Sequence, residues 1–151
     1  MRFDLAAGGG EWFTFFTSEI KEDGQIVYNK PENDAAQVCL RVADEETIDK
    51  IRGTTRTIKK EFVYNPKTRA MERVVYEEQT PEQSREERRL TWDHAIVAWK
   101  GILDLEGNEI PCTVDNKMKL MGNPQFLRFV GRCLQLISGA AQDAEKAAEK
   151  N

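Results

Sequence analysis

The chain has 151 residues, of which 40% are hydrophobic and 32% charged, and its formal net charge is −4. We expect a single α+β domain over residues 1–140, since this length allows a buried core, and a polar, helical or frayed tail over 141–151. The acidic balance disfavours a nucleic-acid-binding protein, which usually carries a basic face. No stretch approaches the roughly 18 apolar residues of a membrane span, so no membrane partner is expected and a cytoplasmic protein is predicted.

The first part of the chain predicts strands and one short helix. Residues 11–20 are aromatic and β-branched, and residues 21–24 are typical of a turn into a second strand. Residues 35–43 alternate apolar and polar side chains with the period of two expected of a strand. Asp44 then suits the cap of a short helix that Gly53 is expected to end.

Residues 56–64 and 70–80 predict the two arms of a β-hairpin, joined by a connection of common length. The hairpin is the most basic part of an acidic chain. Its basic residues are Arg56, Lys59, Lys60, Lys67, Arg69 and Arg73. Two interpretations are open: a solvated hairpin face, or a docking surface for an acidic partner.

The rest of the chain predicts three helices. The first follows Thr80 with Pro81 at the first helical position, and apolar residues at helical spacing extend it past Trp99. The other two are predicted over 113–122 and 123–140. The expected fold is therefore α+β, with N-terminal antiparallel β hairpins and a short helix followed by three C-terminal helices.

The residue types that carry chemistry are sparse. His94 is the only histidine, and it follows Asp93 directly. Neighbouring helical positions point about 100° apart, so this pair does not form a relay of the serine-hydrolase kind, and a histidine on a helix surface is expected. Cys39, Cys112 and Cys133 lie among apolar neighbours and are expected to be small buried hydrophobes. Neither an enzyme nor a cofactor is expected.

The segment 104–109, with the sequence DLEGNE, superficially resembles a calcium loop. An EF-hand loop needs Gly at position 6 and Glu at position 12. Counted from Asp104, the glycine falls at position 4 and position 12 is Asp115. A tight turn at 106–108 is therefore expected in place of a metal site, because Gly and Asn tolerate positive φ.

The segment from Trp92 to Val130 carries a longer pattern: Trp-x-Gly-Ile, an Asp-x-x-Gly turn, an apolar-Pro pair, and a capping Thr followed by Asn. The matching residues are Trp99, Gly101, Ile102, Asp104, Gly107, Ile110, Pro111, Thr113 and Asn116. This segment resembles the C-terminal half of tail assembly chaperones of long-tailed bacteriophages. The resemblance implies a protein of the bacterial host cytoplasm that binds the tape-measure protein during tail assembly and keeps it soluble, without a cofactor.

Two alternatives to this function stay open. One is a virion structural protein, such as a tail-completion or head–tail connector component, in which the hairpin would serve subunit contacts. The other is a small hydrolase or ligand-binding domain that uses His94. The oligomeric state is also open, and a sheet edge would suit a homo-oligomer.

Overall fold

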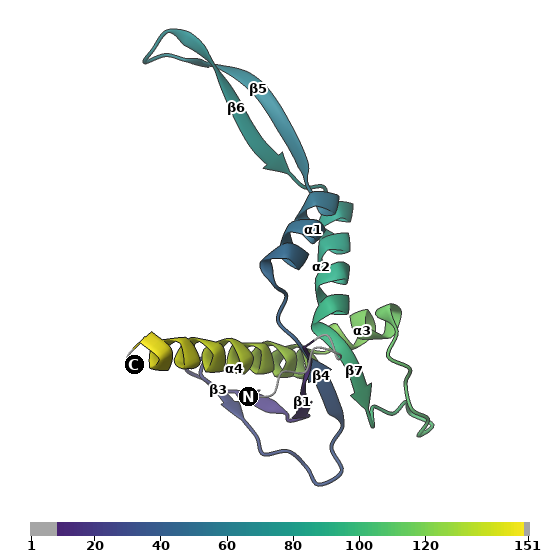
Figure 1. Ribbon diagram of the computed structural model, residues 1–151. Coiled ribbons are helices and arrows are strands. Elements are labelled where there is room, and N and C mark those ends of the chain that lie inside the picture. The colour runs from purple at the N-terminus through teal and green to yellow at the C-terminus, as the bar shows by residue number, and fades with distance from the viewer. Residues whose placement is uncertain (1–8, 150–151) are drawn as a thin grey trace. The chain divides into compact units, whose positions relative to one another are not determined.

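The computed structural model describes residues 9–149, which form an α+β fold with seven strands and four helices (Figure 1). The chain divides into two compact units. We call Met1–Ala43 with Trp92–Asn151 the core unit, and Asp44–Thr91 the hairpin unit. The single domain expected over 1–140 stays a prediction, because compactness does not measure cooperative unfolding.

Two antiparallel sheets lie in the core unit. β1 (Glu11–Thr14), β4 (Gln37–Leu40) and β7 (Ile96–Lys100) form one sheet, with β4 in the middle. β2 (Ser18–Ile20) and β3 (Ile26–Tyr28) form the other. The N-terminal strands and hairpins of the expected fold are therefore present.

The single strand expected over 11–20 is wrong, because the chain divides it between the two sheets. Phe15 and Phe16 lie in the break, and their ring centroids are 5.1 and 5.0 Å from that of Phe129. The backbone N–H of Phe15 still donates to the carbonyl of Ala36 at 2.7 Å, and packing of both rings against buried Phe129 accompanies the break between the two sheets. The turn expected over 21–24 is confirmed.

Both C-terminal helices begin where predicted. The side chain of Thr113 caps α3 (Val114–Met121). Asn123 caps α4 (Pro124–Glu149) by accepting two backbone N–H bonds of 2.9 and 3.4 Å. The backbone of α4 stays helical to Glu149, so the tail extends the helix, which is one of the two outcomes expected for it.

The predicted start of α2 (Pro81–Ala95) is also confirmed. Thr80 and Gln83 exchange hydrogen bonds of 2.9 and 3.1 Å, which is a capping box. The expected continuation past Trp99 is wrong, because residues 96–100 form strand β7.

A β-bulge explains why β7 imitates a helix in the sequence. The register with β4 shifts between Cys39 and Leu40, which leaves Val97 as an extra residue on β7. The bulge lets Ile96 and Trp99 both be buried although they are three positions apart. That spacing normally indicates one face of a helix, whereas β-branched residues and pairing along β4 favour the strand.

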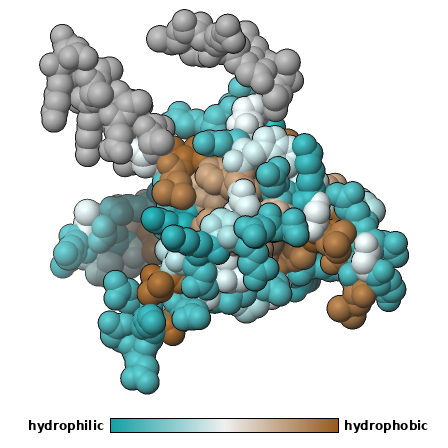
Figure 2. All heavy atoms as spheres, turned by 90° about the horizontal axis from the view of Figure 1, so that it is seen from below, coloured by the Kyte–Doolittle hydropathy of each residue, from teal (hydrophilic) through white to brown (hydrophobic). Residues whose placement is uncertain are grey.

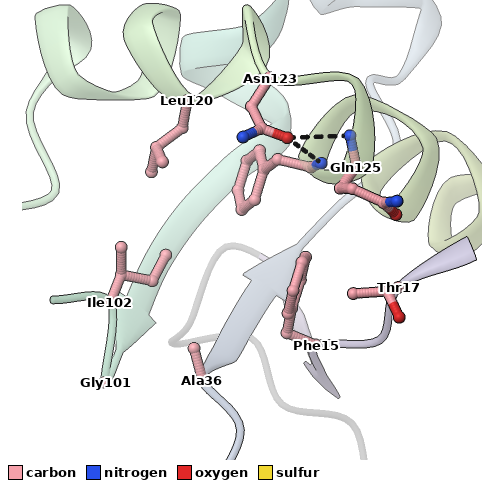
Figure 3. Close-up of a pocket in the computed structure, with 9 residues that line it drawn as sticks. Phe15, Thr17, Ala36, Gly101, Ile102, Leu120, Asn123 and Gln125 are labelled. Carbon is pink, nitrogen blue, oxygen red and sulfur yellow. Dashed lines mark hydrogen bonds between the residues drawn. The ribbon is translucent and has the colours of Figure 1, made fainter. Parts of the chain in front are cut away.

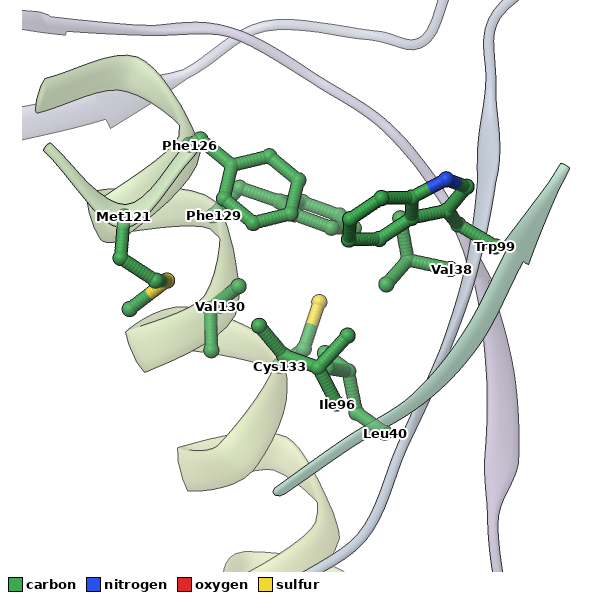
Figure 4. Close-up of a cluster of buried hydrophobic side chains, with 9 residues drawn as sticks. All are labelled: Val38, Leu40, Ile96, Trp99, Met121, Phe126, Phe129, Val130 and Cys133. Carbon is green, nitrogen blue, oxygen red and sulfur yellow. The ribbon is translucent and has the colours of Figure 1, made fainter. Parts of the chain in front are cut away.

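The hydrophobic core of the core unit forms where the sheet meets α3 and α4 (Figure 4). Its buried members are Val38, Leu40, Ile96, Trp99, Met121, Phe126, Phe129, Val130 and Cys133. None of them comes from the hairpin unit, in which Thr55 alone is buried. All fully buried large apolar side chains among the described residues therefore belong to the core unit, whereas Ile48, Ile51 and Leu90 of the hairpin unit are half-buried.

The cysteines mostly follow the prediction. Cys39 and Cys133 are buried and Cys112 is half-buried. Burial raises the pKa of the Cys133 thiol to about 12, so this thiol is unreactive at neutral pH.

Within residues 9–149, no helix combines the length and the apolar character that crossing a membrane requires.

The hairpin unit contains one complete helix, two long strands and most of α2. In chain order, the first three are α1 (Glu45–Thr55), β5 (Thr57–Asn65) and β6 (Ala70–Glu78). Asp44 caps α1 as predicted, accepting the N–H of Thr47 at 2.8 Å. The end expected at Gly53 is wrong, because the helix continues to Thr55, whose hydroxyl donates to the carbonyl of Ile51 at 2.7 Å.

We predict that Phe129→Ala lowers the free energy of unfolding by about 3–5 kcal/mol, because it leaves a cavity in the core. Urea denaturation followed by tryptophan fluorescence measures the loss. Leu105→Ala is the control, since Leu105 is fully exposed and its truncation should change stability by less than about 0.5 kcal/mol. Equal losses in the two variants would contradict the assigned core.

Candidate protein-binding surface

The hairpin predicted from the sequence is confirmed. β5 and β6 pair along their whole length, from Thr57 opposite Glu78 to Asn65 opposite Ala70. They form a two-stranded sheet of their own, so each strand has one unpaired edge. Within the hairpin unit no other element packs along the sheet, and both of its faces are exposed.

The register assigns each side chain to a face, because directly opposite residues of an antiparallel pair share one. We call one face the apolar face, since it carries five large apolar side chains that are 56–70% exposed. These are Ile58, Phe62, Tyr64, Met71 and Val75. Lys60, Arg73 and Glu77 lie on the same face.

The opposite face of the hairpin satisfies its own polar groups. Lys59 pairs with Glu78 at 3.8 Å, and the hydroxyl of Tyr76 donates to Glu61 at 2.8 Å. This hydrogen bond raises the pKa of the Tyr76 phenol. The opposite face therefore needs no partner for its carboxylates.

The apolar face has cations without counter-charges. Its one carboxylate, Glu77, is bound by Arg56 at 2.9 Å. Within the described part of the chain, Lys60 and Arg73 form no ion pair. Lys60 lies opposite Val75 and Arg73 opposite Phe62, so the two cations occupy neighbouring rows on different strands.

The six basic residues predicted as one patch therefore separate into three groups. Arg56 and Lys59 are used in ion pairs. Lys67 lies in the connecting turn, and so does Arg69, which has a φ of +56°. Lys60 and Arg73 are the two cations of the apolar face that form no ion pair among the described residues. Whether any of the six binds a partner stays a prediction.

Polar contacts anchor the base of the hairpin. Glu87 on α2 accepts hydrogen bonds from Arg56 and Gln79, both at 3.1 Å, and Gln83 donates to the hydroxyl of Thr57 at 3.1 Å. The hydrogen bond from Gln79, followed by that from Arg56, holds the pKa of Glu87 below its usual range. Hydrogen bonds rather than an apolar core therefore connect the hairpin to its unit.

The segment at 99–110 is a structural turn. The indole N–H of Trp99 donates to the carbonyl of Ile110 at 2.7 Å. The carboxylate of Asp104 accepts two backbone N–H groups of the turn at 2.9 and 3.0 Å, and Gly107 has a φ of +83°. The predicted turn is thus confirmed. Within residues 9–149, no group of three or more His, Cys, Asp or Glu side chains is placed to hold a metal ion.

The remaining motif residues also have structural roles. Gly101 has a φ of +79°, and a Cβ there would lie 3.5 Å from the Cα of Ala36. The side-chain amide of Asn116 donates to the carbonyl of Pro111 at 2.9 Å, and Thr113 caps α3. The motif builds the connection from β7 to α3, and a role for it in partner binding stays a prediction.

His94 lies on a helix, as the sequence predicts; it is in the last turn of α2 and is half-buried. Its carbonyl accepts a hydrogen bond from Arg41 at 2.7 Å. The neighbouring Asp93 accepts two bonds from the ammonium of buried Lys117, at 2.9 and 3.1 Å. Asp93 therefore pairs the end of α2 with α3, which is a structural role.

The core unit also contains a half-open cavity of about 450 Å³ at the start of α4 (Figure 3). Phe15, Ile102 and Leu120 supply apolar walls. The side chain of Gln125 is already used, because it bonds the backbone of Ser18. The cavity suits an apolar group.

On the face drawn in Figure 2, hydrophilic side chains predominate and hydrophobic ones form small separate groups.

We predict that the carboxyl of Glu87 titrates below its ordinary value of 4.5. The ionised form stabilises the hairpin base above that value, and the stabilisation is lost as pH falls through the lowered pKa of the folded state. Gln79→Ala should raise the pKa, because its amide is the main cause of the shift. An NMR pH titration measures it. Gln135→Ala, an exposed change in the core unit, is the control, and an identical titration in both variants would contradict the assignment.

The chain matches no protein-family model, no curated protein sequence and no solved structure.

Proposed function

We propose that this chain is an assembly chaperone, a protein without catalytic activity that binds another protein through the apolar face of its hairpin. The observation that carries the proposal is that the hairpin unit exposes large apolar side chains on two long strands and buries none. Contiguous exposed apolar surface of this kind marks interaction sites in proteins.

The energetics of the hairpin support binding. A two-stranded hairpin is at best marginally stable in water on its own, and here polar contacts connect it to α2. Covering one apolar face would bury side chains such as Phe62, which is 70% exposed. Since burial stabilises by roughly 25 cal/mol per Å² of apolar surface, a partner would stabilise the hairpin while the hairpin shields the partner.

The identity of the partner rests on the resemblance of the segment from Trp92 to Val130 to phage tail assembly chaperones. On that basis the partner is the tape-measure protein of a phage or prophage, and binding takes place in the cytoplasm of the bacterial host. No cofactor, nucleic acid or membrane enters the proposal. The half-open cavity beside Phe15 offers a second contact for an apolar side chain of the same partner.

We predict that co-expression with the cognate tape-measure protein increases the soluble fraction of that protein and gives a complex in a pull-down. Phe62→Ser should abolish the complex, because it removes the most exposed large side chain of the apolar face. Val63→Ser is the matched control: Val63 is the next residue, is 48% exposed and lies on the opposite face.

Two results would overturn the proposal. One is that wild-type protein forms no complex and leaves the solubility of the tape-measure protein unchanged. The other is that the two serine variants bind equally well, which would separate binding from the apolar face. Circular dichroism of both variants shows that the fold is retained, since each substitution is on an exposed strand position.

A second candidate function is a virion structural protein, and the two unpaired edges of β5 and β6 favour it. Exposed strand edges can pair with strands of another subunit. Mass spectrometry of purified particles separates the two functions, because a structural component is present in the finished particle and a chaperone is absent from it.

A further inference from the structure

We propose that the ligand of the apolar face is an amphipathic α-helix with acidic residues on both borders of its apolar stripe. This inference rests on the proposed function of the face as a binding surface and adds the chemical class of the bound segment. It follows from the order in which the register of β5 and β6 arranges apolar and charged side chains.

The apolar side chains form one continuous stripe across both strands. From the base of the hairpin, the rows of the face pair Ile58 with Glu77, Lys60 with Val75, Phe62 with Arg73, and Tyr64 with Met71. The stripe therefore zigzags along the hairpin, from Ile58 on β5 to Val75 on β6 and back to Phe62 on β5, and ends on the row of Tyr64 and Met71. Lys60 borders it on the β5 side, and Arg73 borders it on the β6 side.

The dimensions of this stripe fit one helix. Ile58 and Tyr64 are six positions apart on β5, which corresponds to about 20 Å at 3.4 Å per residue. A helix of about 14 residues has the same length. A helix is also about 10 Å across with its side chains. Two strands whose axes are about 4.8 Å apart form a sheet of about the same width.

The charges favour a helical ligand with acidic borders over a second copy of this chain. The single carboxylate of the face is bound by Arg56, so two copies packed face to face would bring cations together without a free counter-charge. An added edge strand would satisfy backbone groups and leave the apolar stripe exposed. Carboxylates on both sides of an apolar helical stripe would meet Lys60 and Arg73.

The test uses two labelled synthetic peptides of about three heptads with leucine at the a and d positions. One has glutamate at every e and g position and the other has lysine there, and like charges keep each peptide from pairing with itself. Fluorescence anisotropy measures their affinities. We predict that the wild-type protein binds the acidic peptide at least about tenfold more tightly, and that circular dichroism shows a helical complex.

A charge-reversal pair makes the test specific. Lys60→Glu with Arg73→Glu should reverse the preference, so that the basic peptide binds more tightly. Lys67→Glu with Arg69→Glu is the matched control, because it makes the same charge change in the connecting turn and should keep the wild-type preference. The four positions are exposed, so folding is retained in both variants.

Equal affinity for the two peptides would overturn the inference, and so would a reversal of preference in the turn variant. Concentration-dependent dimerisation through this face, seen by sedimentation and abolished by Phe62→Ser, would replace the helix with a second copy. A complex with the tape-measure protein that is indifferent to Lys60 and Arg73 would overturn the helix inference and leave the proposed function standing. A preference for the acidic peptide without a complex with the tape-measure protein would support the helix inference and overturn the proposed function.

Discussion

The structure depends on how the chain divides its apolar side chains between burial and exposure. The core unit places them between a three-stranded sheet and its C-terminal helices. The rings of Phe15 and Phe16, which follow β1, pack against Phe129 in this core. The hairpin unit has no such core, although eight of its large apolar side chains lie on two long strands. Burial therefore stabilises one unit by itself, whereas the other needs a covering partner to gain the same stabilisation.

Topology explains how a fold tolerates a unit without a core. β4 and β7 are neighbours in the sheet, and the hairpin unit is the connection between them. An insertion between paired strands costs little additional loop-closure entropy as it lengthens. The chain returns through α2, which changes into β7 directly after Ala95. The sheet thus fixes both ends of the insertion, and its exposed hairpin is not required for the core.

Local signals were sufficient to predict much of this fold. Capping side chains at Asp44, Thr80, Thr113 and Asn123 place the start of every helix, because each cap is a contact between residues two or three positions apart. β7 was missed because its identity is decided by pairing with β4, and the bulge at Val97 gives it helical spacing. For the candidate site, the sequence predicted the hairpin and its six basic residues. Only the register distinguishes Lys60 and Arg73 from the cations that are already paired.

The cations on the apolar face also explain how such a surface can remain exposed. An uncharged apolar strand pair with open edges invites association with identical copies. Lys60 and Arg73 oppose that association, because both borders of the stripe carry the same charge and Glu77 is already bound by Arg56. The same two residues favour a ligand whose charge is opposite, so they add selectivity to an affinity that comes from apolar burial. If the apolar face binds a partner as proposed, the charges that keep copies apart are therefore also the charges that would select an acidic partner.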